Sequence, residues 1–125
     1  MSLVLDAGAF IAFERGDRMV AALLKRELLA QRRPRTHGGI VGQVWRGGAR
    51  QARTARLLEA VEVAALDREL GRRTGLLLGR TRRDDVIDGA LVLQANDGDW
   101  IVTSDPGDLR ALAEGAGLHV DIVEP

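Results

Sequence analysis

The chain has 125 residues, no cysteine, and 18 basic residues balanced by 18 acidic ones. This length suits one domain with its own hydrophobic core, and the lack of cysteine excludes disulfides and zinc–thiolate sites. No apolar run approaches the roughly 18 residues that a membrane span needs, and no basic segment precedes an apolar run as in a signal peptide. We therefore expect a single domain over residues 1–125 that works in the cytoplasm, away from membranes.

The balanced net charge is unevenly distributed along the chain. Residues 1–62 hold 11 basic and 6 acidic residues, whereas residues 63–125 hold 7 and 12. This asymmetry excludes a uniformly basic nucleic-acid-binding protein, but it allows a local basic surface beside an acidic pocket. All basic residues except Lys25 are arginine, which suits bidentate phosphate contacts, although genome composition explains such a bias equally well.

The predicted elements alternate between short strands and amphipathic helices. Residues 3–5 are an apolar run that ends in Asp6, which is typical of a buried parallel strand followed by a helix. In chain order we expect strands at 3–5, 61–63, 100–103 and 118–123 and a short connector or weak strand at 35–38, with helices in the intervals between them. This order predicts an α/β fold, a three-layer α/β/α sandwich with a short central parallel sheet.

Several local expectations follow from single residues. Asp17 and Asp67 are predicted helix N-caps, and Asp108 is expected to start the last helix. Glycines recur every four residues at positions 71, 75 and 79. Because glycine lowers helix stability, this row indicates close packing against another element. His37 and His119 are assigned no chemical role, since nothing pairs them for acid–base work.

Aspartates follow two of the predicted strands at the same relative position. Asp6 follows the first strand and Asp105 follows the strand at 100–103, while Asp88 opens or enters the preceding helix and Asp108 lies one turn beyond Asp105. Each residue alone is more often a helix cap or turn residue. In a parallel sheet, however, strand ends meet at one edge, so we expect these side chains to converge there, with the Asp6 charge solvated. Converging carboxylates without basic partners favour a divalent cation, Mg²⁺ or Mn²⁺.

Three segments carry a resemblance to a known family over essentially the whole chain. They are Leu3-Val4-Leu5-Asp6, Asp88-Gly89-Ala90-Leu91, and Ile101-Val102-Thr103-Ser104-Asp105 followed by Leu109. In this combination the chain resembles PIN-domain ribonucleases of the VapC toxin type. The resemblance implies an α/β/α fold, metal-dependent cleavage of RNA, and a role as the toxin of a type II toxin–antitoxin pair.

The resemblance also implies site residues. Asp6, Asp88 and Asp105 match three of the family's four acidic positions, and Gln43 stands where the family has a glutamate. Asp6 and Asp88 are expected to bind Mg²⁺ (or Mn²⁺) directly, and Asp105 to bind a second ion or orient the attacking water. Gln43 keeps an oxygen ligand without the charge, and Asp85 or Glu62 is a candidate to compensate.

Partners are expected on two surfaces. Arg46, Arg50 and Arg53 belong to a row of arginines that we interpret either as a solvated face or as the RNA-backbone contact. The apolar stripe Met19–Leu28 is typical of a helix face packed in the core, but beside Phe10–Phe13 it can also leave a groove for a partner helix. A cognate small antitoxin is expected in that groove, between these two helices. The resemblance also implies a possible homodimer.

Two other function classes are compatible with some of these features. Gln43 motivates a catalytically weakened or inactive PIN-like domain that binds RNA or protein without cutting. A phosphoryl-transfer or receiver-like domain also places aspartates at strand ends, but it needs a lysine near the site. The single lysine, Lys25, lies mid-helix among leucines, which disfavours this class.

Overall fold

A computed structural model describes all residues from 1 to 125, and its centre is a five-stranded sheet. The strand order is β3-β2-β1-β4-β5, and every neighbouring pair is parallel. The strands are β1 (Leu3–Leu5), β2 (Arg35–His37), β3 (Glu62–Ala64), β4 (Trp100–Val102) and β5 (Asp121–Val123). The parallel α/β architecture predicted from the alternation of elements is confirmed.

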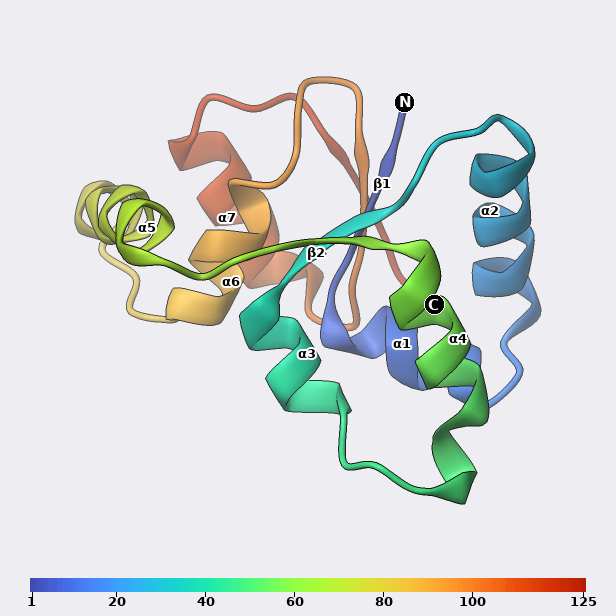
Figure 1. Cartoon of the computed structure of the whole chain (residues 1–125). Helices are drawn as coiled ribbons and strands as arrows, with labels where there is room; N and C mark the ends of the chain where they lie inside the picture. Colours follow the sequence, from blue (N-terminus) through green and yellow to red (C-terminus); the bar gives the residue numbers. More distant parts are fainter.

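Helices cover both faces of this sheet and complete the three layers. The helices are α1 (Ala7–Glu14), α2 (Arg18–Leu29), α3 (Gly38–Val44), α4 (Ala52–Ala60), α5 (Arg68–Thr81), α6 (Val86–Val92) and α7 (Pro106–Gly115), with a short 3₁₀ turn, η1 (Ala49–Gln51). Helix α1 packs against α2, α3 and α4, whereas α5, α6 and α7 pack against one another on the other side (Figure 1). No helix has the length and apolar character to cross a bilayer.

The core is organised around β1, whose three residues are fully buried. A strand covered on both faces has no polar side, which explains the unbroken apolar run Leu3–Leu5. Phe10 of α1, Leu91 of α6 and Leu109 of α7 are also fully buried. Burial of Phe10 and Leu109 in the core thus fixes α1 and α7, the helices that follow β1 and β4.

Helix starts largely follow the local signals. Asp17 accepts a hydrogen bond from the Val20 amide (2.9 Å) and Asp67 accepts one from the Leu70 amide (3.0 Å), which confirms both predicted caps. The last helix starts at Pro106, earlier than the predicted Asp108, because proline is well suited to the first turn of a helix.

Two other expectations are wrong. A Cβ added at positions 71, 75 or 79 would meet nothing within 4 Å, so the glycine row of α5 faces open space and packs against no element. The last strand is shorter than predicted, Asp121–Val123. Before it, the His119 amide donates to Asp97 and its carbonyl accepts from the Gly98 amide, so His119 bonds to the loop before β4 and not to a neighbouring strand.

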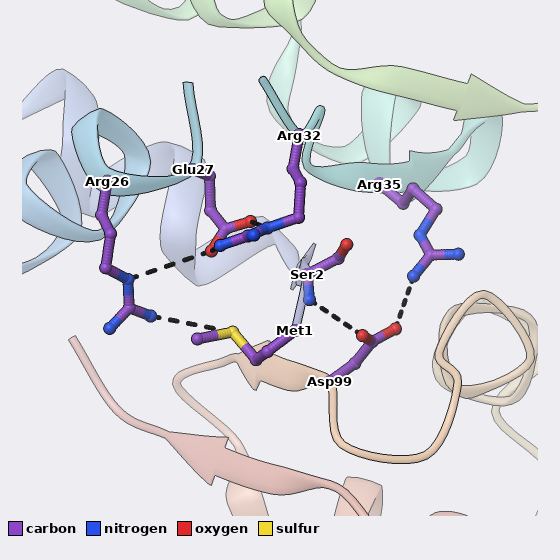
Figure 2. Close-up of polar contacts among 7 residues, drawn as sticks. All are labelled: Met1, Ser2, Arg26, Glu27, Arg32, Arg35 and Asp99. Atoms are coloured by element: carbon purple, nitrogen blue, oxygen red, sulfur yellow. Dashed lines mark hydrogen bonds and ion pairs between the residues drawn. The ribbon is translucent and has the colours of Figure 1, made fainter. Parts of the chain in front are cut away.

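A buried carboxylate fixes the amino-terminal edge of the sheet (Figure 2). Asp99 is 4% exposed and accepts hydrogen bonds from the Ser2 amide (2.9 Å), the Asn96 amide (2.8 Å) and the guanidinium of Arg35. These contacts join β1, β2 and β4 at one point. They support the register in which Leu5 pairs with Val102. This register determines which residues lie next to each other where β1 and β4 end, at the carboxyl-terminal edge of the sheet.

The second polar cluster in Figure 2 lies at the end of α2. Glu27 is completely buried and accepts two hydrogen bonds from Arg32, at 2.8 and 3.2 Å. Arg26 stacks over the Trp100 ring, 4.8 Å from its centroid. Because a buried charge needs a partner, the Glu27–Arg32 pair holds the chain leaving α2 close to the sheet.

Candidate metal site

Carboxylates from three segments meet at the carboxyl edge of the sheet. Asp105 follows β4, Asp108 lies one turn later in α7, and Asp88 lies in the first turn of α6. One carboxylate oxygen from each of the three lies within 4.8 Å of the others. We call Asp88, Asp105 and Asp108 the carboxylate cluster. The sequence grouped Asp88 with Asp105 correctly, and it flagged Asp108 without naming it as a ligand.

Asp6 lies beside the carboxylate cluster and is held from two sides. Its Oδ1 accepts the Ala7 amide (2.8 Å), and its Oδ2 accepts the Thr103 hydroxyl (2.6 Å). The same Thr103 oxygen accepts the Asp105 amide (2.9 Å), so one hydroxyl connects the ends of β1 and β4. Asp6 is 8% exposed; the expectation that its charge is solvated is wrong, because α1 and the segment after β4 close over it.

A glycine makes this close approach possible. A Cβ at Gly8 would lie 2.1 Å from the Ser104 Oγ and 2.9 Å from the Ser104 backbone nitrogen. Only a residue without a side chain allows α1 to start this close to the end of β4. The small residues that follow Asp6 in the sequence are therefore part of how Asp6 and Asp105 are brought together.

The carboxylates raise one another's proton affinity. Burial raises the pKa of Asp88 from 3.8 to about 7, and the charges of Asp85, Asp6, Asp105 and Asp108 contribute in that order. The pKa of the Asp105 carboxyl is also raised, by desolvation and then by the nearby charge of Asp108. Like charges that converge without enough counter-charge make the ionised form unfavourable. A bound cation would reverse this effect.

One basic side chain reaches the carboxylate cluster. The Arg83 guanidinium forms an ion pair with Asp108, with both side chains well exposed at 37% and 50%. The remaining ion pairs of the protein involve Glu27 and Asp99, far from this edge. Asp6, Asp88 and Asp105 therefore have no cationic partner within the chain.

The donor set fits a divalent cation. It consists of carboxylate oxygens alone, which Mg²⁺ and Mn²⁺ prefer. Two oxygens bound to one Mg²⁺ lie at most about 4.2 Å apart, because each ligand distance is about 2.1 Å. The observed spread of up to 4.8 Å needs only small side-chain rotations to reach that limit.

Gln43 and the two proposed compensating carboxylates fall in different places. Gln43 is exposed on α3, and no hydrogen bond connects it to the carboxylate cluster. Glu62 lies in β3, two strands away from β1, and its backbone is in register with Arg35 of β2 and Val4 of β1. It therefore does not contribute a charge to the carboxylate cluster. Asp85 does contribute: it caps α6 by accepting the Asp88 amide (3.0 Å), and its charge acts on Asp88.

The arginines proposed for RNA binding are exposed but do not contact the carboxylate cluster. Arg46 donates to the carbonyls of Gly42 and Trp45, at 3.0 and 2.8 Å. Arg53 reaches the Glu14 carbonyl (3.5 Å) at the far end of α1, and Arg50 lies in η1. The structure does not bring these three residues to the site.

Two other arginines do lie beside the carboxylate cluster. Arg82 and Arg83 line a cavity of about 480 Å³ whose wall also includes Asp85, Asp88 and Asp108. Neither arginine stood out as a site residue in the sequence. The available signal was the run Arg82-Arg83-Asp84-Asp85, which places both charges directly before the helix that carries Asp88.

His37 is a further residue that sequence reasoning left without a role. It ends β2, is fully buried, and its Nδ1 accepts the Gly39 amide (3.1 Å). The other ring nitrogen therefore carries the proton and donates to the Ile87 carbonyl (2.9 Å). Desolvation lowers the pKa of His37, which keeps the ring neutral. This contact fixes the first turn of α6 immediately before Asp88.

Comparison with models of known protein families and with curated proteins gives no match for this chain. Function is therefore inferred from the chemistry of the site and from the surfaces around it.

Proposed function

We propose that this chain is a metal-dependent endoribonuclease that hydrolyses RNA phosphodiester bonds with Mg²⁺ or Mn²⁺. The observation that carries the proposal is the convergence of Asp88, Asp105 and Asp108 within 4.8 Å, with Asp6 alongside and one arginine as the only counter-charge. The resemblance to VapC-type PIN-domain ribonucleases, stated from the sequence, supports the same activity. It places Asp6, Asp88 and Asp105 among the metal ligands.

The electrostatic cost of the arrangement supports a cation ligand over a purely structural role. Carboxylates this close destabilise a fold unless a positive charge joins them. Capping accounts for the neighbouring Asp85, which caps α6. It does not account for Asp105, whose side chain makes no cap hydrogen bond at the start of α7.

In the proposed reaction the residues of the chain hold the metal ligands in place and orient the attacking water. Thr103 and the Ala7 amide fix both oxygens of Asp6, so this carboxylate presents a constant geometry to a ligand. Asp88 has to release its proton before it can act as a ligand, because its pKa is about 7. Asp105, which is exposed, accepts a hydrogen bond from the attacking water and orients it. The metal, when bound, lowers the pKa of that water and neutralises charge on the phosphate.

The groove predicted for an antitoxin has a counterpart in the structure. A cavity of about 450 Å³ between α1, α2 and α4 is lined by apolar side chains, including Phe13, Leu24 and Leu57, with Arg53 and Arg56 beside them. We propose that a small antitoxin with an amphipathic, acidic helix binds there. Coexpression with the adjacent reading frame and copurification tests this. Of the leucines that line this cavity, Leu24 is buried and Leu28 is exposed. Leu28→Asp should therefore abolish copurification without unfolding the protein.

A second candidate function, an RNA- or protein-binding module without nuclease activity, is favoured by the exposed position of Gln43. If the fourth ligand of this site had to come from α3, it would be the neutral Gln43, and the site would have one negative charge fewer. In our proposal Asp85 and Asp108 supply the negative charge instead.

Cleavage of RNA by the purified protein separates the two functions. A short fluorogenic single-stranded RNA is incubated with Mn²⁺, with Mg²⁺ or with EDTA. Asp6→Asn, Asp88→Asn and Asp105→Asn should each lose activity. Asp121→Asn, an exposed residue at the opposite edge of the sheet, is the matched control and should retain it. If the wild type and Asp6→Asn show the same background rate of RNA cleavage, the ribonuclease proposal is refuted and only the binding-module function remains.

A further inference from the structure

We propose that Arg83 is the phosphate-binding residue of this site, and that Asp108 holds its guanidinium at the edge of the carboxylate cluster until a divalent cation takes over the carboxylate. The inference rests on the ribonuclease function proposed above. It names the contact to the RNA backbone that the arginines predicted from the sequence do not provide.

The position of Arg83 is set by the turn between α5 and α6. Arg82 ends α5 in the left-handed conformation (φ 56°), and the Arg83 amide donates to the Leu78 carbonyl (3.1 Å). The chain thus reverses within two residues, and both arginine side chains line the cavity that also contains Asp85 and Asp88. The Arg83 guanidinium consequently shares one cavity with two carboxylates of the cluster, Asp88 and Asp108.

The composition of this cavity matches a phosphate bound next to a cation. Carboxylates in the lining attract the cation, and a guanidinium in the same lining can donate two parallel hydrogen bonds to phosphate oxygens. A cavity used only for a metal ion would gain nothing from arginines, because they compete for the same carboxylates. Arg83 contacts the carboxylate cluster directly through its ion pair with Asp108.

The Arg83–Asp108 pair is suited to exchange. Both side chains are more than one-third exposed, and ion pairs between exposed groups contribute little to stability. A divalent cation that draws Asp108 into its coordination sphere leaves the guanidinium without a partner. The guanidinium is then free at the position where the backbone of an RNA bound to the cation would pass.

The arginine row from the sequence analysis is too far away for this role. Arg53 contacts Glu14, which lies eight residues beyond Asp6 along α1, a distance of about 12 Å in a helix. Arg83, by contrast, contacts Asp108 of the carboxylate cluster itself.

The test is Arg83→Gln, because a phosphate-binding residue and a merely structural counter-ion predict different results. Arg72→Gln, which changes an exposed arginine of the preceding helix α5 outside the cavity, is the matched control. Affinity for Mn²⁺ alone is measured by isothermal titration calorimetry. Affinity for a short single-stranded RNA is measured by fluorescence anisotropy with Ca²⁺ in place of the catalytic metal.

For Arg83→Gln we expect Mn²⁺ to bind as tightly as in the wild type or up to about fivefold more tightly, since a competitor for Asp108 is gone. RNA should bind about tenfold more weakly or worse, which is typical for loss of a charge-assisted hydrogen bond. Arg83→Lys should recover part of the RNA affinity, because it restores the charge without the two-pronged geometry. Arg72→Gln should change neither affinity.

Unchanged RNA affinity in Arg83→Gln would overturn the inference while leaving the ribonuclease proposal intact, provided that the wild type binds Mn²⁺ and cleaves RNA. Equal weakening of Mn²⁺ and RNA binding would also overturn it, because Arg83 would then only support the shape of the site. A wild-type protein that fails to bind Mn²⁺ would overturn the proposed function itself, and this inference with it.

Discussion

Replacing Asp88 by asparagine should stabilise the metal-free protein at neutral and higher pH. The Asp88 side chain is partly buried, and its carboxyl has a pKa of about 7 against an ordinary value of 3.8. This difference corresponds to at most about 4 kcal/mol, and solvent screening of a partly exposed group reduces it to about 1–2 kcal/mol. Asparagine removes the penalty, although it also loses a weakly favourable charge in the first turn of α6.

The pH dependence of this effect has a definite sign. Between about pH 4 and pH 7 the native state holds a proton on Asp88 that the unfolded state has already released, so native stability falls as pH rises. The wild type should therefore match Asp88→Asn near pH 4 and fall behind it progressively up to pH 7. Above that pH the gap should stay constant, at about 3–8 °C in melting temperature for a domain of this size.

Thermal melts in EDTA and in Mn²⁺ provide the assay. In EDTA near pH 8 the variant should melt higher, and in saturating Mn²⁺ the order should reverse. A ligand at a hundred times its dissociation constant adds about 2.7 kcal/mol to the wild type alone. A variant that melts lower than the wild type in EDTA at this pH would refute the reasoning, because Asp88 would then be stabilised by its neighbours instead of repelled.

Three further substitutions probe the scaffold of the site. Thr103→Val should cost about 1.5–3 kcal/mol in urea unfolding, because Asp6 loses a hydrogen bond to a buried charge; it should also lower the cleavage rate. Gly8→Ala should cost about 1–3 kcal/mol, since its methyl group would collide with Ser104, and an unchanged unfolding midpoint would contradict the packing described. Asp99→Ala should cost about 3–5 kcal/mol, because it leaves a guanidinium and two amides without their partner; circular dichroism melts would detect this.

The sequence by itself determined the features that depend on neighbours along the chain. The apolar run before Asp6 specifies a strand buried on both faces, whatever surrounds it. Asp17 and Asp67 cap helices through amides three residues away, so their role is local. The same holds for the order of strands and helices, which predicts a parallel sheet and places Asp6 and Asp105 at one edge.

Tertiary packing alone decided the interior of the site. The spacing of residues along α7 does not determine how this helix is rotated about its own axis. Only the packing of α5, α6 and α7 shows that Asp108 completes the carboxylate cluster. Packing likewise buries Asp6, leaves Gln43 exposed, and brings Arg83 onto Asp108 across 25 residues of chain. Side-chain distances of a few ångströms between remote segments depend on helix rotation and strand register, and these are fixed by the whole core at once.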